Sequence, residues 1–165
     1  MNNKRRERDT ASGSILEMTV KSTLEKKGFR ITSHTLWKKN PSRYGKELLL
    51  TNAPYKSIYA HPAKTEFLAI SEKYNLKIRI ECKWQQVAGS VDEKLPYLYL
   101  NTIEAMPEDH IIIIIDGGGW KTGSIPWLKD AIAKKKYTNE ISSKKNIEVM
   151  DLKGFLTWVN QNLRS

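Results

Sequence analysis

An acid and an amine stand two residues apart in a short stretch that otherwise has the character of a buried strand. The stretch is Ile78-Arg79-Ile80-Glu81-Cys82-Lys83-Trp84. Successive strand side chains point to opposite faces, so Glu81 and Lys83 share one face with Gln85, while the apolar residues share the other. A carboxylate, an ammonium and an amide on one rigid strand can hold a divalent cation and an attacking water. The alternative is a solvated sheet face that carries an ion pair.

The composition indicates an acidic partner. The 165 residues include 28 Lys and Arg against 18 Asp and Glu, a formal net charge of +10. The phosphates of nucleic acid are the simplest match. The only long apolar run, Ile111 to Ile115, is far too short to span a bilayer, and no signal-peptide segment follows the first residues. Cys82 is the single cysteine and has no disulfide partner. We therefore expect a cytoplasmic protein with no membrane association.

The first half of the chain predicts one helix followed by strands. Residues 1–10 are charged and are expected to be a basic, disordered arm, with 11–165 as a single domain. A helix is expected to begin at Ser12 or Ser14 and to end at Gly28, because apolar residues recur at helical spacing between them. Strands are predicted at these positions: 47–51, 65–70 and 76–84.

The second half alternates strands with helices. A helix is expected within residues 91–105, and the continuous run Ile111 to Ile115 suits a strand covered on both faces. A helix at 126–134, a strand at 147–150 and a helix at 152–163 with Asp151 as its N-cap complete the pattern. Strand, crossover helix and strand imply parallel pairing. The fold class is therefore α/β, with a central mixed sheet, antiparallel at one side and parallel at the other, flanked by helices.

The order of elements and the triplet Glu81-Cys82-Lys83 together resemble the PD-(D/E)XK nuclease superfamily. In that family, a metal-binding acid at the start of one strand is followed by acid-x-lysine on the next strand. The resemblance covers roughly residues 13–115, and the segment from Gln86 to Tyr97 is similar to one found in phage and bacterial nucleases of the superfamily. It implies a restriction-endonuclease-like core in the order αβββαβ and a bacterial or phage origin.

The first acid of this pattern departs from the family. No aspartate lies between Asp9 and Asp92, and only Glu66 and Glu72 fall in the expected window. Glu72 belongs to a polar turn, whereas Glu66 is at the head of a strand and is the better candidate. A glutamate can ligate a hard cation as an aspartate does, if a small backbone shift absorbs its extra methylene. The alternative for Glu66 is an exposed edge acid paired with Lys64.

Two more residues are implied by the resemblance. Glu17, in the first helix, would extend a carboxylate to the metal or its water, and Gln85 would help to organise the metal site. Each has another interpretation. Ser14-Ile15-Leu16-Glu17 is also a capping-box pattern, and Gln85 can be a polar strand end.

The segment from Asp116 to Gly123 contains three consecutive glycines but matches neither the phosphate-loop nor the dinucleotide pattern. Glycines after a buried strand more often form a tight turn or let another backbone approach. Lys121 in this segment and Lys94 are candidates for contacts with DNA phosphates. The alternative is that both lysines are simply solvated.

The resemblance implies a Mg²⁺-dependent DNA endonuclease in which Mn²⁺ substitutes for Mg²⁺. The implied metal ligands are Glu66, Glu81, the backbone carbonyl of Cys82 and Glu17, and Lys83 would lie against the attacking water and the phosphate. Restriction enzymes, Holliday-junction-type resolvases and phage or mobile-element nucleases all fit. A noncatalytic nucleic-acid-binding protein on a degenerate nuclease fold is the alternative from another class, and the missing aspartate supports it. Cutting two strands usually requires a dimer, so a homodimer is compatible with this function.

Overall fold

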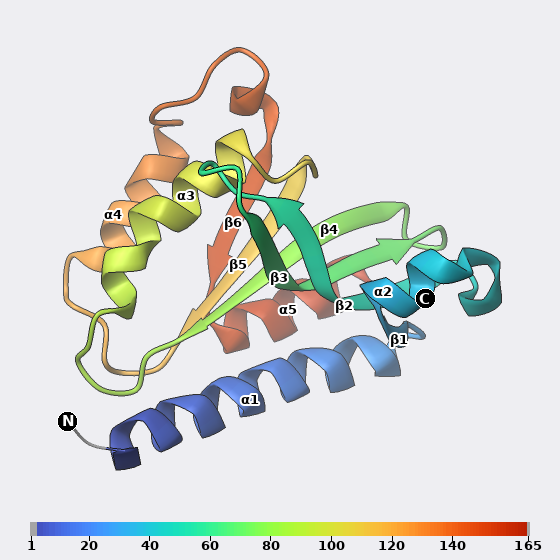
Figure 1. Ribbon diagram of the computed structural model, residues 1–165, viewed down its shortest axis with the longest axis horizontal. Coiled ribbons are helices and arrows are strands. Elements are labelled where there is room, and N and C mark those ends of the chain that lie inside the picture. Colours follow the sequence, from blue (N-terminus) through green and yellow to red (C-terminus); the bar gives the residue numbers. More distant parts are fainter. Residues whose placement is uncertain (1–2, 165) are drawn as a thin grey trace.

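The structure, a computed structural model, describes residues 3–164, with side chains from Gly13 onward. Within these residues, helices cover both faces of one mixed sheet (Figure 1). Helices α1 (Asn3–Lys26) and α5 (Leu152–Asn162) pack on one face. Helices α3 (Leu95–Glu104) and α4 (Ser124–Ala133) pack on the other. The fold is therefore the α/β, restriction-endonuclease-like architecture that the sequence predicts.

The sheet places its strands in chain order, from β1 to β6. The strands are β1 (Arg30–Ser33), β2 (Glu47–Lys56), β3 (Pro62–Ser71), β4 (Leu76–Trp84), β5 (His110–Asp116) and β6 (Asn146–Met150). β2, β3 and β4 form an antiparallel meander, and β4, β5 and β6 are parallel. β1 adds a second parallel pair at the opposite edge, beside β2. Shorter helical elements are α2 (His34–Lys39), η1 (Pro41–Tyr44), η2 (Val91–Lys94) and η3 (Ser142–Lys144).

The isoleucine run of β5 lies at the centre of the molecule. Ile112 and Ile114 join the cluster under α1 and α5, and Ile111, Ile113 and Ile115 join the cluster under α3 and α4. All five side chains are at most 3% exposed. A strand covered on both faces must be apolar at every position, which explains why this run shows no alternation.

The first helix differs from its predicted bounds. α1 begins at Asn3, before the expected start at Ser12 or Ser14, and takes in most of the predicted arm. Met1 and Asn2 lie outside the described residues. Lysine, arginine and glutamate are good helix formers, so a charged segment can continue a helix. The capping-box interpretation of Ser14 and Glu17 is wrong, because both lie inside the helix rather than at its start.

Two further details follow from the described residues. The sequence pattern predicted neither β1 nor α2. β1 has only four residues, and these form a strand because they pair with β2. Asp151 is the N-cap of α5, as predicted, and its side chain accepts a hydrogen bond from Gly154 N at 2.7 Å. None of the helices in residues 3–164 combines the length and the apolar character needed to cross a bilayer.

Candidate active site

The candidate site lies where the pairing between β3 and β4 stops. The last paired residues are Phe67 and Ile80, so the next position along these strands holds Glu66 and Glu81. Beyond this point the strands have unpaired backbone groups. Glu66 satisfies one of them, because its Oε2 accepts the N–H of Cys82 at 2.8 Å. The sheet therefore brings two carboxylates together at an opening in its own hydrogen-bond ladder.

Asn52 bends β2 opposite Glu66. Its φ of 52° is in the left-handed region, and the β2–β3 pairing skips only the Asn52 and Glu66 position within its span. Leu48, Leu50 and Ala53 pack in the same cluster, although strict alternation would put Ala53 on the other face. The face that each residue occupies therefore changes at Asn52. Glu66, directly opposite Asn52 on β3, interacts with Glu17 of α1 and with the backbone N–H of Cys82 in β4.

Glu81 and Lys83 lie on the same face, as the alternation predicts. Lys83 Nζ is 2.5 Å from Glu81 Oε1, and the Glu81 side chain is 7% exposed whereas that of Lys83 is 25% exposed. The predicted alternative for Glu66, an ion pair with Lys64, is not found: Lys64 forms no ion pair with any described residue. Glu72 lies at the far end of β3, where it pairs with Lys46 at 3.0 Å. Glu66 is therefore the acid that the fold brings to Glu81.

The two carboxylates are crowded. Burial and then the negative charge of Glu81 raise the pKa of Glu66 to about 7, against the hydrogen bond from Cys82 N and the charge of Lys83. Burial is the largest single influence and lowers the pKa of Lys83, but Glu81, Glu66 and Tyr55 together outweigh burial and raise that pKa above its usual value. Lys83 is therefore an ammonium at neutral pH. A site with this charge distribution favours an additional cation.

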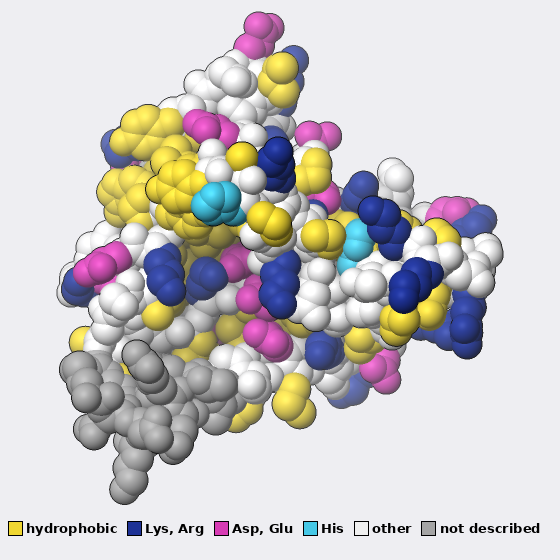
Figure 2. Space-filling view, viewed as in Figure 1, with side chains coloured by type: hydrophobic (Ala, Val, Ile, Leu, Met, Phe, Trp, Pro, Cys, Tyr) yellow, Lys and Arg dark blue, Asp and Glu magenta, His cyan; other side chains and the backbone are white. Residues whose placement is uncertain are grey.

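Glu17 approaches the site from α1. Burial and then the negative charge of Glu66 raise the pKa of Glu17, and Lys21 one turn later lowers it. Glu17, Lys21, Asn52, Lys64 and Glu66 are among the residues that line a cleft of about 320 Å³ between α1 and the bent strands. Figure 2 shows acidic side chains at the middle of this face with lysine and arginine side chains on either side. The cleft thus combines a carboxylate centre with a basic rim.

Gln85 is buried, at 1% exposed, and organises the loop after β4. Its Nε2 donates to Gly119 O at 2.7 Å, and its Oε1 accepts from Val91 N at 2.9 Å. Gln85 directly follows the end of β4, and it is buried and hydrogen-bonded there rather than solvated. Gln85 joins two loops that border the site, and any role toward the metal ligands stays a prediction.

The glycines after β5 allow close contact between backbones. A Cβ on Gly117 would lie 2.4 Å from Gln85 O, and one on Gly119 would lie 2.4 Å from the Val87 backbone. Gly119 N also donates to Gln85 O at 2.8 Å. This agrees with the predicted alternative to a phosphate loop, in which glycine lets another backbone approach.

The two lysines predicted to contact DNA differ in their surroundings. Lys121 Nζ lies 3.5 Å from Asp92 Oδ2 and 3.8 Å from Glu93 Oε1, so two acids offset its charge. Lys94 is exposed and forms no ion pair within the described part of the chain. Contact of either lysine with DNA stays a prediction.

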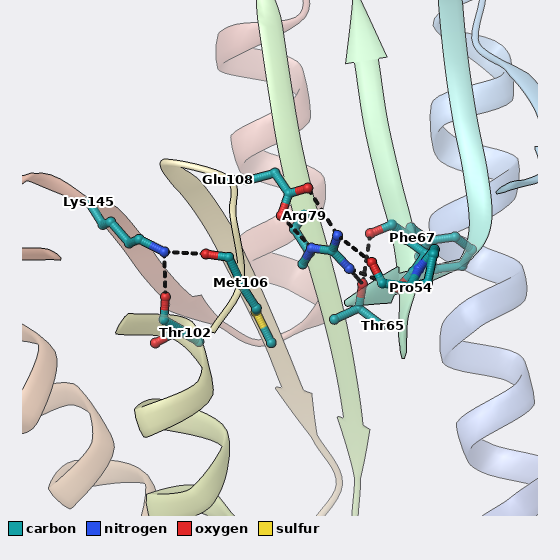
Figure 3. Close-up of polar contacts among 9 residues, drawn as sticks. Pro54, Thr65, Phe67, Arg79, Thr102, Met106, Glu108 and Lys145 are labelled. Carbon is teal, nitrogen blue, oxygen red and sulfur yellow. Dashed lines mark hydrogen bonds and ion pairs between the residues drawn. The ribbon is translucent and has the colours of Figure 1, made fainter. Parts of the chain in front are cut away.

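Arg79 shares the face of Glu81 but is a structural residue. It is 2% exposed and donates to Glu108 Oε1 at 3.0 Å, Thr65 Oγ1 at 3.0 Å, and the carbonyls of Ala53 at 2.8 Å and Pro54 at 3.0 Å (Figure 3). These contacts tie β4 to β2 and β3 immediately beyond the bend. The charge of Arg79 is fully used inside the molecule, so it is not free for a substrate.

Sequence reasoning missed Tyr55, Lys21, Lys64 and Asn52. Burial, then the charge of Glu81 and then Tyr97, raises the pKa of Tyr55, so its hydroxyl interacts electrostatically with the Glu81 carboxylate. The run Asn52-Ala53-Pro54 is the signal for the bend, since both Asn and Pro are unusual inside a strand. No comparable signal exists for Lys21 or Lys64.

The donor set fits a hard divalent cation. Mg²⁺ is usually bound by one or two carboxylates together with waters and substrate phosphates. Glu66 and Glu81 supply two carboxylates, and burial together with the negative charge of Glu81 raises the pKa of Glu66. Among the described residues, no three His, Cys, Asp or Glu side chains converge as a complete ligand set. Water and phosphate oxygens would therefore complete the coordination.

Comparison with known protein families gave a match. A family model described as PD-(D/E)XK nuclease superfamily domain matches residues 8–163, which is nearly the whole chain. Searches of curated proteins and of solved structures gave no match. The matched region contains every residue of the site described above.

Proposed function

The chain belongs to the PD-(D/E)XK nuclease superfamily, and from this we propose that it is a Mg²⁺-dependent DNA endonuclease that hydrolyses phosphodiester bonds between α1 and β4. Membership supports a nuclease with a nucleic-acid substrate. The observation that carries the proposal is the meeting of Glu66, Glu81 and Lys83 at the end of the β3–β4 ladder. DNA is favoured by the net charge of +10 and by the basic rim of the cleft.

Glu66, Glu81 and the carbonyl of Cys82 would hold the cation, with Glu17 acting on it or on its water from α1. When bound, Mg²⁺ lowers the pKa of water and offsets the negative charge that grows on the phosphate; Mn²⁺ would substitute. Glu66 could bind the cation without breaking its hydrogen bond to Cys82 N, because its Oε2 accepts that bond and its Oε1 is a second ligand oxygen. The hydrogen bond from Cys82 would instead keep the carboxylate in a fixed orientation.

Lys83 would stabilise negative charge rather than accept a proton. Its raised pKa keeps it protonated at neutral pH, and an ammonium has no lone pair with which to act as a base. Glu81 Oε1 holds the ammonium at 2.5 Å, beside the position proposed for the scissile phosphate. The charge of Lys83 would thus be in place before the substrate arrives, as electrostatic stabilisation of a transition state requires.

The test separates cleavage from binding. Glu81→Ala and Lys83→Ala are each expected to abolish plasmid cleavage in Mg²⁺, while binding of DNA measured in Ca²⁺ stays within a few-fold of the unmodified chain. Lys77→Ala is the matched control, because Lys77 is an exposed lysine on the same strand and is expected to leave cleavage unchanged. Normal cutting by Glu81→Ala or Lys83→Ala would show that the site is assigned wrongly. DNA binding without cleavage by the unmodified chain would instead favour the noncatalytic binding protein.

A further inference from the structure

Two exposed tyrosines form a stacked pair that the site described above does not include. Tyr59, in the connection between β2 and β3, is 66% exposed, and Tyr97, near the start of α3, is 37% exposed. Their ring centroids are 5.2 Å apart and their planes differ by 25°. Neither residue contributes to the core clusters. The pair is therefore an aromatic surface whose rings are not part of the hydrophobic core.

The turn that carries Tyr59 is joined to α3, which carries Tyr97, by a hydrogen bond to a side chain. Ile58 N, next to Tyr59, donates to Asn101 Oδ1 at 2.9 Å, and Asn101 is a buried residue of α3 one turn beyond Tyr97. The turn itself is closed by Ser57 N donating to His61 O at 2.9 Å. Figure 1 shows the β2–β3 connection reaching α3. A preorganised pair loses little conformational freedom when it binds a third ring.

The pair lies within reach of the carboxylates. Tyr55 packs against the cluster under α3, the helix that carries Tyr97, and the guanidinium of Arg79, on the same face of β4 as Glu81, lies 5.3 Å from the Tyr55 ring centroid. Along β3, Glu66 and Pro62 are four residues apart, which is about 13 Å of strand and about the length of four stacked nucleotides. A polynucleotide strand cut at Glu66 and Glu81 and running along β3 would therefore reach the turn that carries Tyr59.

Two lysines of the β2–β3 hairpin, which carries Tyr59 in its turn, are available to contact a phosphate backbone. Lys56 and Lys64 are exposed on the β2–β3 hairpin, and neither forms an ion pair with a described residue. Figure 2 shows hydrophobic side chains gathered over α3 and α4 on the same face as the acidic centre. Proteins that bind single strands combine these features: a basic track for the backbone and aromatic rings for the bases.

We propose that Tyr59 and Tyr97 form a stacking platform for an unpaired base, so that the substrate is DNA with a single-stranded segment next to the cut. This inference rests on the nuclease function proposed above and specifies its substrate class. A base within a continuous duplex has both faces covered by its neighbours, whereas an unpaired base has a face to offer. Stacking of this kind selects no base sequence, because every base has a π-face.

Binding in Ca²⁺ tests the platform without requiring cleavage. The probes are a fluorescent single-stranded oligonucleotide carrying 2-aminopurine and the fully paired duplex of the same sequence. Tyr59→Ala and Tyr97→Ala are each expected to weaken binding of the single strand by about 5- to 100-fold, and binding of the duplex by less than about two-fold. The quenching of 2-aminopurine seen with the unmodified chain should be lost in both variants and kept in Tyr59→Phe, which retains the ring.

Tyr137→Ala is the matched control, because Tyr137 is 69% exposed in the segment after α4, and this variant is expected to bind both probes normally. Equal losses on single strand and duplex, or no loss on either, would overturn the platform. Failure of binding by the unmodified chain to any polynucleotide would overturn it as well. Cleavage measured in parallel separates the two proposals. If the chain cuts DNA but the tyrosine substitutions do not change single-strand binding, only the platform is rejected. If the substitutions weaken single-strand binding but the unmodified chain does not cut, only the nuclease activity is rejected.

Discussion

Glu66 is held in an electrostatically unfavourable position by the contacts of its neighbours. Its carboxylate is buried beside Glu81, and its pKa is raised to about 7 in consequence. The hydrogen bond from Cys82 N and the charge of Lys83 offset only part of that cost. A bound cation would offset the rest, so the arrangement that is costly to the free protein is the one that favours a metal. Such sites commonly trade stability for function.

Replacement of this carboxyl should therefore stabilise the metal-free protein in a pH-dependent way. The pKa of Glu66 is higher in the folded state, at about 7, than in the unfolded chain, so ionisation makes folding less favourable as pH rises toward 7. We expect Glu66→Gln to raise the free energy of unfolding by about 1 to 3 kcal/mol at pH 8, and by almost nothing at pH 4.5. Chemical denaturation in EDTA at both pH values measures the difference. A gain that is the same at both would exclude charge crowding as its cause.

Glu17 provides a second test at the residue scale. It lies inside α1, so it has no capping role, and its pKa responds to Glu66. Glu17→Gln should lower the cleavage rate by about 10- to 100-fold, as loss of a group next to metal ligands typically does. The free energy of unfolding should change by no more than about 0.5 kcal/mol. Glu25 is exposed on the same helix, so Glu25→Gln should preserve the cleavage rate. A similar loss of cleavage rate in both variants would show that any change of charge on α1 lowers activity, and that Glu17 has no specific role.

At the scale of elements, three features position the site: the end of the β3–β4 ladder, the bend in β2, and the contact between the loops after β4 and β5. The β3–β4 ladder ends at Phe67 and Ile80, and β2 bends at Asn52. The loop after β4 is held against the loop after β5 by Gln85 and Gly119. Neighbouring strands that separate beyond their last pair leave room for a ligand, provided that the loops beyond them keep a fixed geometry.

The close approach of these loops predicts a large difference between adjacent glycines. A Cβ at Gly119 would lie 2.4 Å from the backbone of Val87, whereas one at Gly118 would meet nothing within 4 Å. Gly119→Ala should destabilise the protein by about 1 to 3 kcal/mol, because the backbone must move to make room. Gly118→Ala is the matched control and should change stability by less than about 0.5 kcal/mol. Thermal or urea unfolding compares the two, and equal effects would argue against a close loop contact.

At the scale of the whole molecule, the site lies between two helical layers and under a basic surface. The net charge of +10 is distributed so that lysines border the cleft while carboxylates occupy its centre. Under the proposed function, this arrangement would attract phosphate from a distance, and the carboxylates would accept a metal within the same site. The binding energy from the basic rim is independent of base sequence.

Affinity for DNA should accordingly fall steeply with salt. The logarithm of the binding constant is expected to decrease linearly with the logarithm of salt concentration, and Lys64→Ala should reduce the slope by about 1. Lys64 borders the cleft and has no ion-pair partner among the described residues. Lys144→Ala serves as control, since Lys144 is an exposed lysine in η3, outside the cleft lining. Fluorescence anisotropy over a salt series gives both slopes, and identical slopes for Lys64→Ala and the unmodified chain would place the DNA elsewhere.

Local periodicity was sufficient to predict much of this protein. The two-residue period of a strand put Glu81 and Lys83 on one face, and the unbroken isoleucine run of β5 indicated a strand buried on both sides. The order of helices and strands followed from the same patterns and led to the fold class. These features depend on contacts between residues that are close in sequence, which is why sequence alone carries them.

Contacts between distant segments were decided only by tertiary structure. Glu66 reaches Cys82 because β2 bends at Asn52 and the β3–β4 ladder ends, neither of which has a local period. Arg79 shares the face of Glu81 by alternation, yet Glu108, 29 positions away, neutralises it inside the core. Periodicity states which face of an element a side chain occupies; which partner it meets there depends on how the elements pack, and packing is a property of the whole chain.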